Sequence, residues 1–327
     1  MSLLVDGILR QDEWLDNQTK DGHYVRRDSQ FRHWVTSDGA AGPSGDAGFK
    51  AESGRYHLYV SYACPWAHRT LIFRQIKQLE THISFSVVSP DMLQAGWSFD
   101  TAFPGSTGET LYGLDYMHQI YTKAQSNYSG IVTVPVLWDK QQETIVNNES
   151  SEIIRMLNSA FNELTGNNDD YYPQDLRAEI DSINQRIYDC LNNGVYRCGF
   201  AATQAAYDEA FDHLFDTLDF LETHLSQQRY LVGEQITEAD LRLIPTLLRF
   251  DPVYVGHFKC NRQRISDFDN LSNYTRDLYQ QLDLSKTTYF DHIKRHYYFS
   301  HEKINPTRIV PKGPNINLEL AHDRNRF

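Results

Sequence analysis

The clearest alternation of apolar and polar positions lies between residues 55 and 161. Short runs rich in β-forming side chains predict strands there, and apolar positions three and four residues apart predict helices. The expected strands are 55–61, 83–88, 132–138 and 144–146, and the expected helices are 65–80 and 150–161. A Gly- and aromatic-containing insertion, 89–130, separates the second strand from the third. The element order is therefore β-α-β, insertion, β-β-α.

Beyond a polar, turn-rich stretch at 162–173, the pattern becomes almost wholly helical. One apolar stripe at helical spacing comprises Tyr207, Phe211, Leu214, Phe215, Leu218 and Leu221, and further helices are expected at about 175–192, 238–249, 270–282 and 287–299. Thr237 and Asp240 form a variant of the capping box, and Ile236 and Leu241 stand where a hydrophobic staple requires apolar residues. We therefore place the domain boundary at 162–173.

The two ends of the chain lack such periodicity. Residues 1–53 carry glycines every third position around Pro43, but the Lys-Ser/Thr and helix of a phosphate loop do not follow. We expect a turn-rich extension there and an extended surface tail at 301–327. The expected fold class is α/β plus all-α. A thioredoxin-like domain (β-α-β-β-α) at 54–165, with the insertion, precedes an all-helical domain at 172–300.

Composition excludes several classes of protein. The 31 Lys and Arg against 43 Asp and Glu give a net charge of −12, which argues against a nucleic-acid partner. No apolar run reaches the roughly 18 residues of a membrane helix, and the first residues lack the pattern of a secretory signal. Four cysteines are too few and too spread for a disulfide scaffold. We expect an acidic cytoplasmic enzyme, unusually rich in aromatic residues.

Cys64 carries the sharpest chemical signal in the sequence. Cys64-Pro65-Trp66-Ala67 follows a predicted strand and opens a predicted helix, with proline at a position that suits the first turn. A thiol at a helix N-terminus faces unpaired N–H groups and the positive end of the dipole, which favour the thiolate. The alternative is a buried structural cysteine. The later strand proline, Pro135, favours the catalytic thiol.

The residue at position 67 indicates whether the enzyme uses one thiol or two. A dithiol oxidoreductase would place a second cysteine there to resolve its own mixed disulfide, and Ala67 cannot do so. An external thiol must then complete the cycle, and glutathione is the natural candidate in a reducing cytosol. Cys190, Cys198 and Cys260 have no motif spacing and are interpreted as packing residues.

Several motifs together resemble the glutathione transferases, and more narrowly their Xi class, the glutathionyl-hydroquinone reductases. They are Cys64-Pro-Trp-Ala-His-Arg69, Thr133-Val-Pro-Val-Leu-Trp138, Asn148-Glu-Ser-Ser-Glu-Ile-Ile154, the Thr237-x-x-Asp240 cap, Asp251-Pro-Val-Tyr254, His257-Phe-Lys-Cys260 and Ile304-Asn-Pro-Thr307. The resemblance covers nearly the whole chain. It implies glutathione as co-substrate, no tightly bound cofactor and a homodimer.

The resemblance also implies a glutathione site. Backbone groups of Ile131, Val132, Thr133 and Val134 would pair with the peptide, ahead of a cis bond between Val134 and Pro135. Glu149 and Ser150, at a predicted helix start, would bind the γ-glutamyl group, and Trp97 would also contact glutathione. From the residues alone, Glu149 and Ser150 could equally cap a helix, and Trp97 could be a core aromatic.

The sequence departs from the family pattern at one position. The family carries Arg just before the Val-Thr-Val-Pro segment, where it can hold a glutathione carboxylate, and here that residue is Ile131. Backbone contacts could survive this change, but the ion pair could not. We expect weaker glutathione binding, or a substitute cation such as Lys123.

Three tyrosines complete the implied site. Tyr196 is the candidate proton donor, and Tyr254 and Tyr297 would donate hydrogen bonds near the thiol and the hydroquinone. Each could otherwise be a half-buried core residue. The activity implied is glutathione-dependent reduction of S-glutathionyl hydroquinones. An Omega-like thioltransferase or dehydroascorbate reductase, and a non-catalytic glutathione- or quinone-binding protein, remain alternatives. His292 and His296 share a helical face but lack a third metal ligand, so no metal site is expected.

Overall fold

The computed structural model describes residues 2–10 and 19–327, and it divides into two compact units. Of the described residues, the first comprises 2–10, 27–169 and 289–300, and the second comprises 19–26, 170–288 and 301–327. Neither unit is one continuous segment, unlike the ranges 54–165 and 172–300 expected from the sequence. Part of the N-terminal extension groups with the second unit, and the last long helix groups with the first.

A four-stranded sheet forms the centre of the first unit, in the order β4-β3-β6-β7. Its strands are β3 (Tyr56–Val60), β4 (Ser84–Val87), β6 (Val136–Asp139) and β7 (Thr144–Asn147). β3 runs parallel to β4 and antiparallel to β6, which pairs antiparallel with β7. Every residue of β3 is buried, which agrees with its β-branched and aromatic composition.

The predicted strand at 132–138 begins only at β6, so its first half was wrong. The Val134–Pro135 bond is cis, as expected from the resemblance. Pro135 has no N–H to donate to a ladder. The Tyr121 hydroxyl also binds the backbone of Thr133, at 3.0 Å from its carbonyl oxygen and 3.2 Å from its nitrogen. The Val132 nitrogen donates to the Ser2 carbonyl at 3.1 Å, next to β1, and beyond it Thr133 is held by the Tyr121 side chain.

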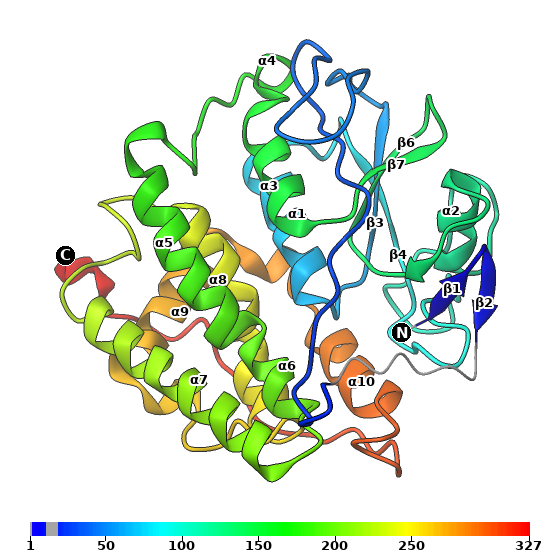
Figure 1. Ribbon diagram of the computed structural model, residues 1–327. Helices are drawn as coiled ribbons and strands as arrows, with labels where there is room; N and C mark the ends of the chain where they lie inside the picture. The colour runs from blue at the N-terminus through cyan, green and yellow to red at the C-terminus, as the bar shows by residue number, and fades with distance from the viewer. Residues whose placement is uncertain (1, 11–18) are drawn as a thin grey trace. The chain divides into compact units, whose positions relative to one another are not determined.

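Helices α1 (Pro65–Ile76) and α3 (Ser150–Ser159) pack together on one side of the sheet, and α2 (Met117–Ala124) lies on the other (Figure 1). α1 ends four residues before the predicted end at Glu80. Gln78 has a positive φ of 57°, which takes the chain out of the helix. A short helix, α4 (Asn162–Thr165), then precedes the boundary between the units.

The N-terminal extension is more ordered than its composition predicts. Strands β1 (Leu3–Val5) and β2 (Ile8–Arg10) pair with each other, and β1 also pairs with β5 (Gly130–Ile131) at the end of the insertion. The prediction of a turn-rich extension was therefore wrong for this part. The β1–β2 hairpin turns at Asp6 and Gly7 and is local. β5 lies more than 120 residues from β1, so no local pattern could reveal that second pairing.

The second unit is almost wholly helical, as predicted. Its main helices are α5 (Arg177–Ile187), α6 (Gly194–Gly199), α7 (Gln204–Leu225), α8 (Glu238–Arg249) and α9 (Asp269–Gln281). The capping box of α8 is confirmed, because Asp240 accepts hydrogen bonds from the Thr237 nitrogen and hydroxyl at 2.8 and 3.1 Å. Asp240 is fully buried, and burial raises its pKa.

None of the described helices is long and apolar enough to cross a membrane.

The C-terminal tail is anchored rather than simply laid over the surface. Arg324 is fully buried, and its guanidinium donates to the carbonyl oxygen of Leu225, the last residue of α7, and to those of Gln228 and Arg229 just beyond it. The last carbonyl groups of a helix, such as that of Leu225, lack intrahelical hydrogen-bond donors, so Arg324 satisfies one of them. The expectation of a surface tail was therefore wrong at this residue.

Candidate active site

Cys64 stands at the junction of β3 and α1. It is the N-cap of α1, with Pro65 in the first turn and φ, ψ of −77° and 123°. Its backbone nitrogen donates to the Ser61 carbonyl at 3.2 Å, which closes the turn. The side chain is 9% exposed, and its sulfur lies 3.5 Å from the Val134 carbonyl oxygen. The thiol therefore meets both the start of a helix and the segment before the cis proline.

The segment leading to Pro135 is coupled to the start of α3 through one buried side chain. The hydroxyl of Tyr121 contacts the Thr133 backbone and also accepts a hydrogen bond from the Asn148 amide at 3.1 Å. Val132 and Val134 are buried on either side of Thr133. Sequence reasoning did not single out Tyr121, because nothing in its local pattern shows which distant backbone its hydroxyl reaches.

Glu149 and Ser150 open α3. Glu149 is the N-cap, and its Oε1 accepts hydrogen bonds from the Ser151 nitrogen at 3.1 Å and the Ser151 hydroxyl at 3.0 Å. Helix capping, one of the two interpretations from the sequence, is therefore confirmed. The buried Arg69 of α1 reaches the Ser150 hydroxyl at 3.4 Å and lies over the Trp66 ring. Arg69 places a cation beside this helix start that sequence reasoning did not assign.

Trp97, in the insertion, stacks on His296 of α10 (Phe290–Ser300), with ring centroids 4.7 Å apart. The His296 Nδ1 lies 3.0 Å from the Pro90 carbonyl oxygen, and the His292 Nε2 lies 2.7 Å from that of Pro104. Both ring nitrogens therefore donate to the insertion. The two histidines considered as metal ligands fasten α10 to the insertion instead.

Tyr297 is also on α10 and is buried, with its ring edge-on to that of His296. α10 belongs to the same unit as Cys64, although it lies more than 220 residues further along the chain. Trp97 and Tyr297 are therefore both positioned by contacts between α10 and the insertion.

Tyr196 and Tyr254 lie in the second unit and contact one another, with ring centroids 6.2 Å apart. Tyr254 is fully buried and stacks on Phe258, which also contacts the half-buried Tyr196. A Cβ at Gly199 would fall 2.1 Å from the Phe258 ring, so glycine is required for this close packing. The second unit therefore presents its two predicted tyrosines in one aromatic cluster.

The remaining cysteines have surroundings typical of packing residues. Cys198 and Cys260 are buried in the second unit, and burial raises the pKa of Cys260 well above its usual value, with Cys198 adding to the shift. Cys190 is half-buried. A thiol whose pKa is raised is a poor nucleophile at neutral pH.

Comparison with known proteins decides the family. A family model for the N-terminal domain of glutathione S-transferases matches residues 63–160, and one for the C-terminal domain matches 204–277. A Xi class glutathione transferase from Natrialba magadii is 46% identical and superposes with a TM-score of 0.91, over 100% of this chain and 97% of that one. The chain belongs to the Xi class of glutathione transferases.

Two curated relatives of this transferase have similar lengths. The glutathionyl-hydroquinone reductase YqjG of Escherichia coli K12 is 55% identical over 99% of this chain and 98% of its own. The glutathionyl-hydroquinone reductase PcpF of Sphingobium chlorophenolicum is 52% identical over 96% of both. The glutathione-bound structure of YqjG superposes with a TM-score of 0.92 at 54% identity, over 99% of this chain and 100% of that one.

Ile131 stands where the family pattern has arginine, and Lys123 is the cation expected to replace it. Ile131 is half-buried in β5, opposite Leu3, and its carbonyl oxygen accepts a hydrogen bond from the Tyr128 hydroxyl at 3.2 Å. Lys123, the expected substitute cation, forms an ion pair with Glu143 at 3.1 Å and lies over the Tyr112 ring. Its ammonium is therefore engaged by another carboxylate, and a role toward glutathione would require this pair to open.

Proposed function

We propose that this protein reduces S-glutathionyl hydroquinones to hydroquinones with glutathione, through a mixed disulfide between Cys64 and glutathione. The observation that carries the proposal is the placement of Cys64 at the N-terminus of α1, one turn before Ala67. A single reactive thiol with no resolving partner at that position suits a cycle that an external thiol completes. The two reductases named above, each more than 50% identical over nearly the full chain, support the same reaction.

The first step breaks a carbon–sulfur bond. The Cys64 thiolate attacks the sulfur of the glutathionyl group, a sulfur–sulfur bond forms, and the electron pair of the carbon–sulfur bond passes to the aryl carbon. That carbon is a poor leaving group, so a proton must reach it as the bond breaks. We assign this donation to Tyr196, because a phenol carries an O–H group that can donate a proton.

The second step regenerates the enzyme. A second glutathione thiolate attacks the sulfur of the bound glutathione in the mixed disulfide. Oxidised glutathione leaves, and Cys64 returns as thiolate. The two electrons that reduce the aryl carbon come from two glutathione sulfurs, one carried in by the substrate as its glutathionyl group and one supplied by the free glutathione thiol. Tyr254 and Tyr297 would donate hydrogen bonds that stabilise the thiolate and the hydroquinone oxygens.

Binding of the tripeptide is assigned to the first unit. Backbone groups of 131–134 would pair with the glutathione backbone, and Trp97 would pack on it. The start of α3 would take the γ-glutamyl end, where the Ser150 hydroxyl and the positive end of the helix dipole suit a carboxylate and Glu149 suits an ammonium. Glutathione is thus a co-substrate. The proposal includes a cytoplasmic location, where glutathione keeps thiols reduced, and a homodimer, both expected from the family.

A single-turnover mass measurement tests this function. The enzyme is mixed with one equivalent of a glutathionyl-hydroquinone, and we expect a glutathione adduct on the Cys64 peptide together with free hydroquinone. Cys64→Ala should give neither product, whereas Cys190→Ser, at a half-buried cysteine without an assigned role, should match the wild type. No adduct and no hydroquinone would overturn the proposal. Parallel assays with mixed disulfides and dehydroascorbate identify an Omega-like activity if either is the better substrate.

A further inference from the structure

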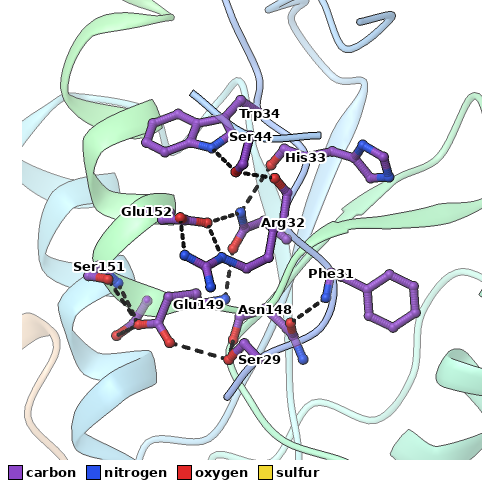
Figure 2. A network of polar contacts seen from close by, with 12 residues as sticks. Ser29, Phe31, Arg32, His33, Trp34, Ser44, Asn148, Glu149, Ser151 and Glu152 are labelled. Atoms are coloured by element: carbon purple, nitrogen blue, oxygen red, sulfur yellow. Dashed lines mark hydrogen bonds and ion pairs between the residues drawn. The ribbon is translucent and has the colours of Figure 1, made fainter. Parts of the chain in front are cut away.

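The start of α3 is held by a segment of the N-terminal extension, residues 29–34, which we call the strap (Figure 2). The strap lies antiparallel beside the end of β7. The His33 nitrogen donates to the Val146 carbonyl at 2.9 Å, and the Asn148 nitrogen donates to the Phe31 carbonyl at 3.2 Å. The Asn148 side-chain oxygen accepts from the Phe31 nitrogen at 3.2 Å. The strap therefore has a fixed register next to Glu149.

The pairing of the strap with β7 places the Ser29 hydroxyl beside the carboxylate of Glu149. Its hydroxyl oxygen lies 3.2 Å from Glu149 Oε2 and 3.1 Å from the Asn148 carbonyl oxygen, so its single proton is shared between the two acceptors. The other carboxylate oxygen, Oε1, is bound by the nitrogen and hydroxyl of Ser151. The two oxygens of Glu149 are thus held from two directions, one by the strap and one by α3 (Figure 2).

The strap binds Glu152, the second carboxylate near the start of α3, through a charged side chain. Glu152, one turn further along α3, forms a two-pronged ion pair with Arg32 and accepts a hydrogen bond from the Asn147 amide at 2.8 Å. A guanidinium neutralises the charge of the carboxylate it binds. A serine hydroxyl orients a carboxylate without adding a positive charge beside it. The strap therefore supplies a guanidinium to Glu152 and a hydroxyl to Glu149.

We propose that Ser29 is a positioning residue for glutathione, acting through Glu149. By holding Oε2, the Ser29 hydroxyl fixes the orientation in which the Glu149 carboxylate meets the ammonium of the γ-glutamyl residue. This inference rests on the glutathione site of the proposed function and adds the extension to that site. Ser29 would affect only the binding of the γ-glutamyl residue. A ligand that lacks this residue should therefore bind equally well with or without the Ser29 hydroxyl.

A comparison of two ligands tests this role. Glutathione and cysteinylglycine differ by the γ-glutamyl residue, and calorimetry measures the affinity of the full-length protein for each. We expect Ser29→Ala to weaken glutathione binding by about ten- to a hundredfold, the range of a hydrogen bond to a charged group, and to leave cysteinylglycine binding within about twofold. Ser29→Thr keeps the hydroxyl and should restore glutathione binding.

Ser44→Ala is the matched control. The Ser44 hydroxyl donates to the Arg32 carbonyl at 2.7 Å and accepts from the Trp34 indole at 2.9 Å, so it also ties the strap but does not touch Glu149. We expect this variant to bind both ligands as the wild type does. Unchanged glutathione binding by Ser29→Ala, or equal losses for both ligands, would overturn the role. A wild type that binds glutathione but releases no hydroquinone contradicts the reductase proposal instead.

Discussion

Tyr62 stacks on Tyr289, with ring centroids 3.7 Å apart and the ring planes 15° from parallel. Tyr62 lies two residues before Cys64, and Tyr289 comes immediately before α10. His292, on the first turn of α10, meets the Tyr62 ring edge-on at 5.2 Å. The turn that carries the candidate nucleophile is thus supported by a helix from the far end of the chain.

Removal of the Tyr289 ring should loosen the Cys64 turn. Tyr289 is half-buried, so we expect Tyr289→Ala to lower the free energy of unfolding by about 1–3 kcal/mol, from lost stacking and lost apolar burial. Cys64 should then react several times faster with iodoacetamide, measured as alkylation of its peptide by mass spectrometry. Tyr289→Phe retains the ring and should react at nearly the wild-type rate. Equal rates for all three proteins would show that the stack does not restrain the turn.

The sequence predicted those parts of the fold and the site that depend on local pattern. β3, the start of α1 at Pro65 and the capping box at Thr237 follow from composition and spacing over a few residues, and the structure contains all three. Cys64 could be singled out because its position between a strand and a helix is itself a local pattern. The cis bond before Pro135 came from the family resemblance.

The sequence could not predict contacts between distant segments. The strap pairs with β7 at a separation of more than 110 residues, and Ser29 lies in a stretch without periodicity, so its contact with Glu149 left no local signal. Contacts of α10 with the first unit include the stacks of Tyr289 and His296, whose ring partners lie more than 190 residues earlier. Such contacts join segments that are distant in the sequence and become neighbours only when the chain folds.

Ile131→Arg should strengthen glutathione binding. The half-buried Ile131 is held in β5 by its backbone, so its side chain can change without loss of the strand. A guanidinium there would supply the ion pair that the family pattern includes, and we expect about a three- to tenfold lower Kd by calorimetry, because a partly exposed pair adds roughly 1 kcal/mol. The gain should shrink as salt is added.

Ile131→Gln separates charge from side-chain length. Glutamine is long and polar but carries no positive charge, so we expect it to bind glutathione no better than the wild type. If arginine and glutamine give the same Kd, the absent ion pair is not what limits binding at this position.

His57 should make the protein sensitive to acid. It is fully buried in β3, between the hydroxyls of Ser84 and Ser86 at 2.8 and 3.0 Å. Burial, with a smaller contribution from the charge of Lys140, lowers the pKa of His57 to about 4. An unfolded histidine has a pKa of roughly 6.5. Between these two values the unfolded state binds the proton and the folded state does not, so stability falls as pH falls through this window.

The difference between the folded and unfolded pKa of His57 sets how much stability the protein loses in acid. His57 should contribute about 2–3 kcal/mol of the loss of stability between pH 7 and pH 4.5, and nothing to the pH dependence above pH 7, where both states are neutral. His57→Gln cannot titrate. Urea unfolding of both proteins across this range should show the stability advantage of the wild type shrinking as the solution becomes more acidic. Parallel curves would mean that His57 takes up its proton equally easily in both states, contrary to its burial.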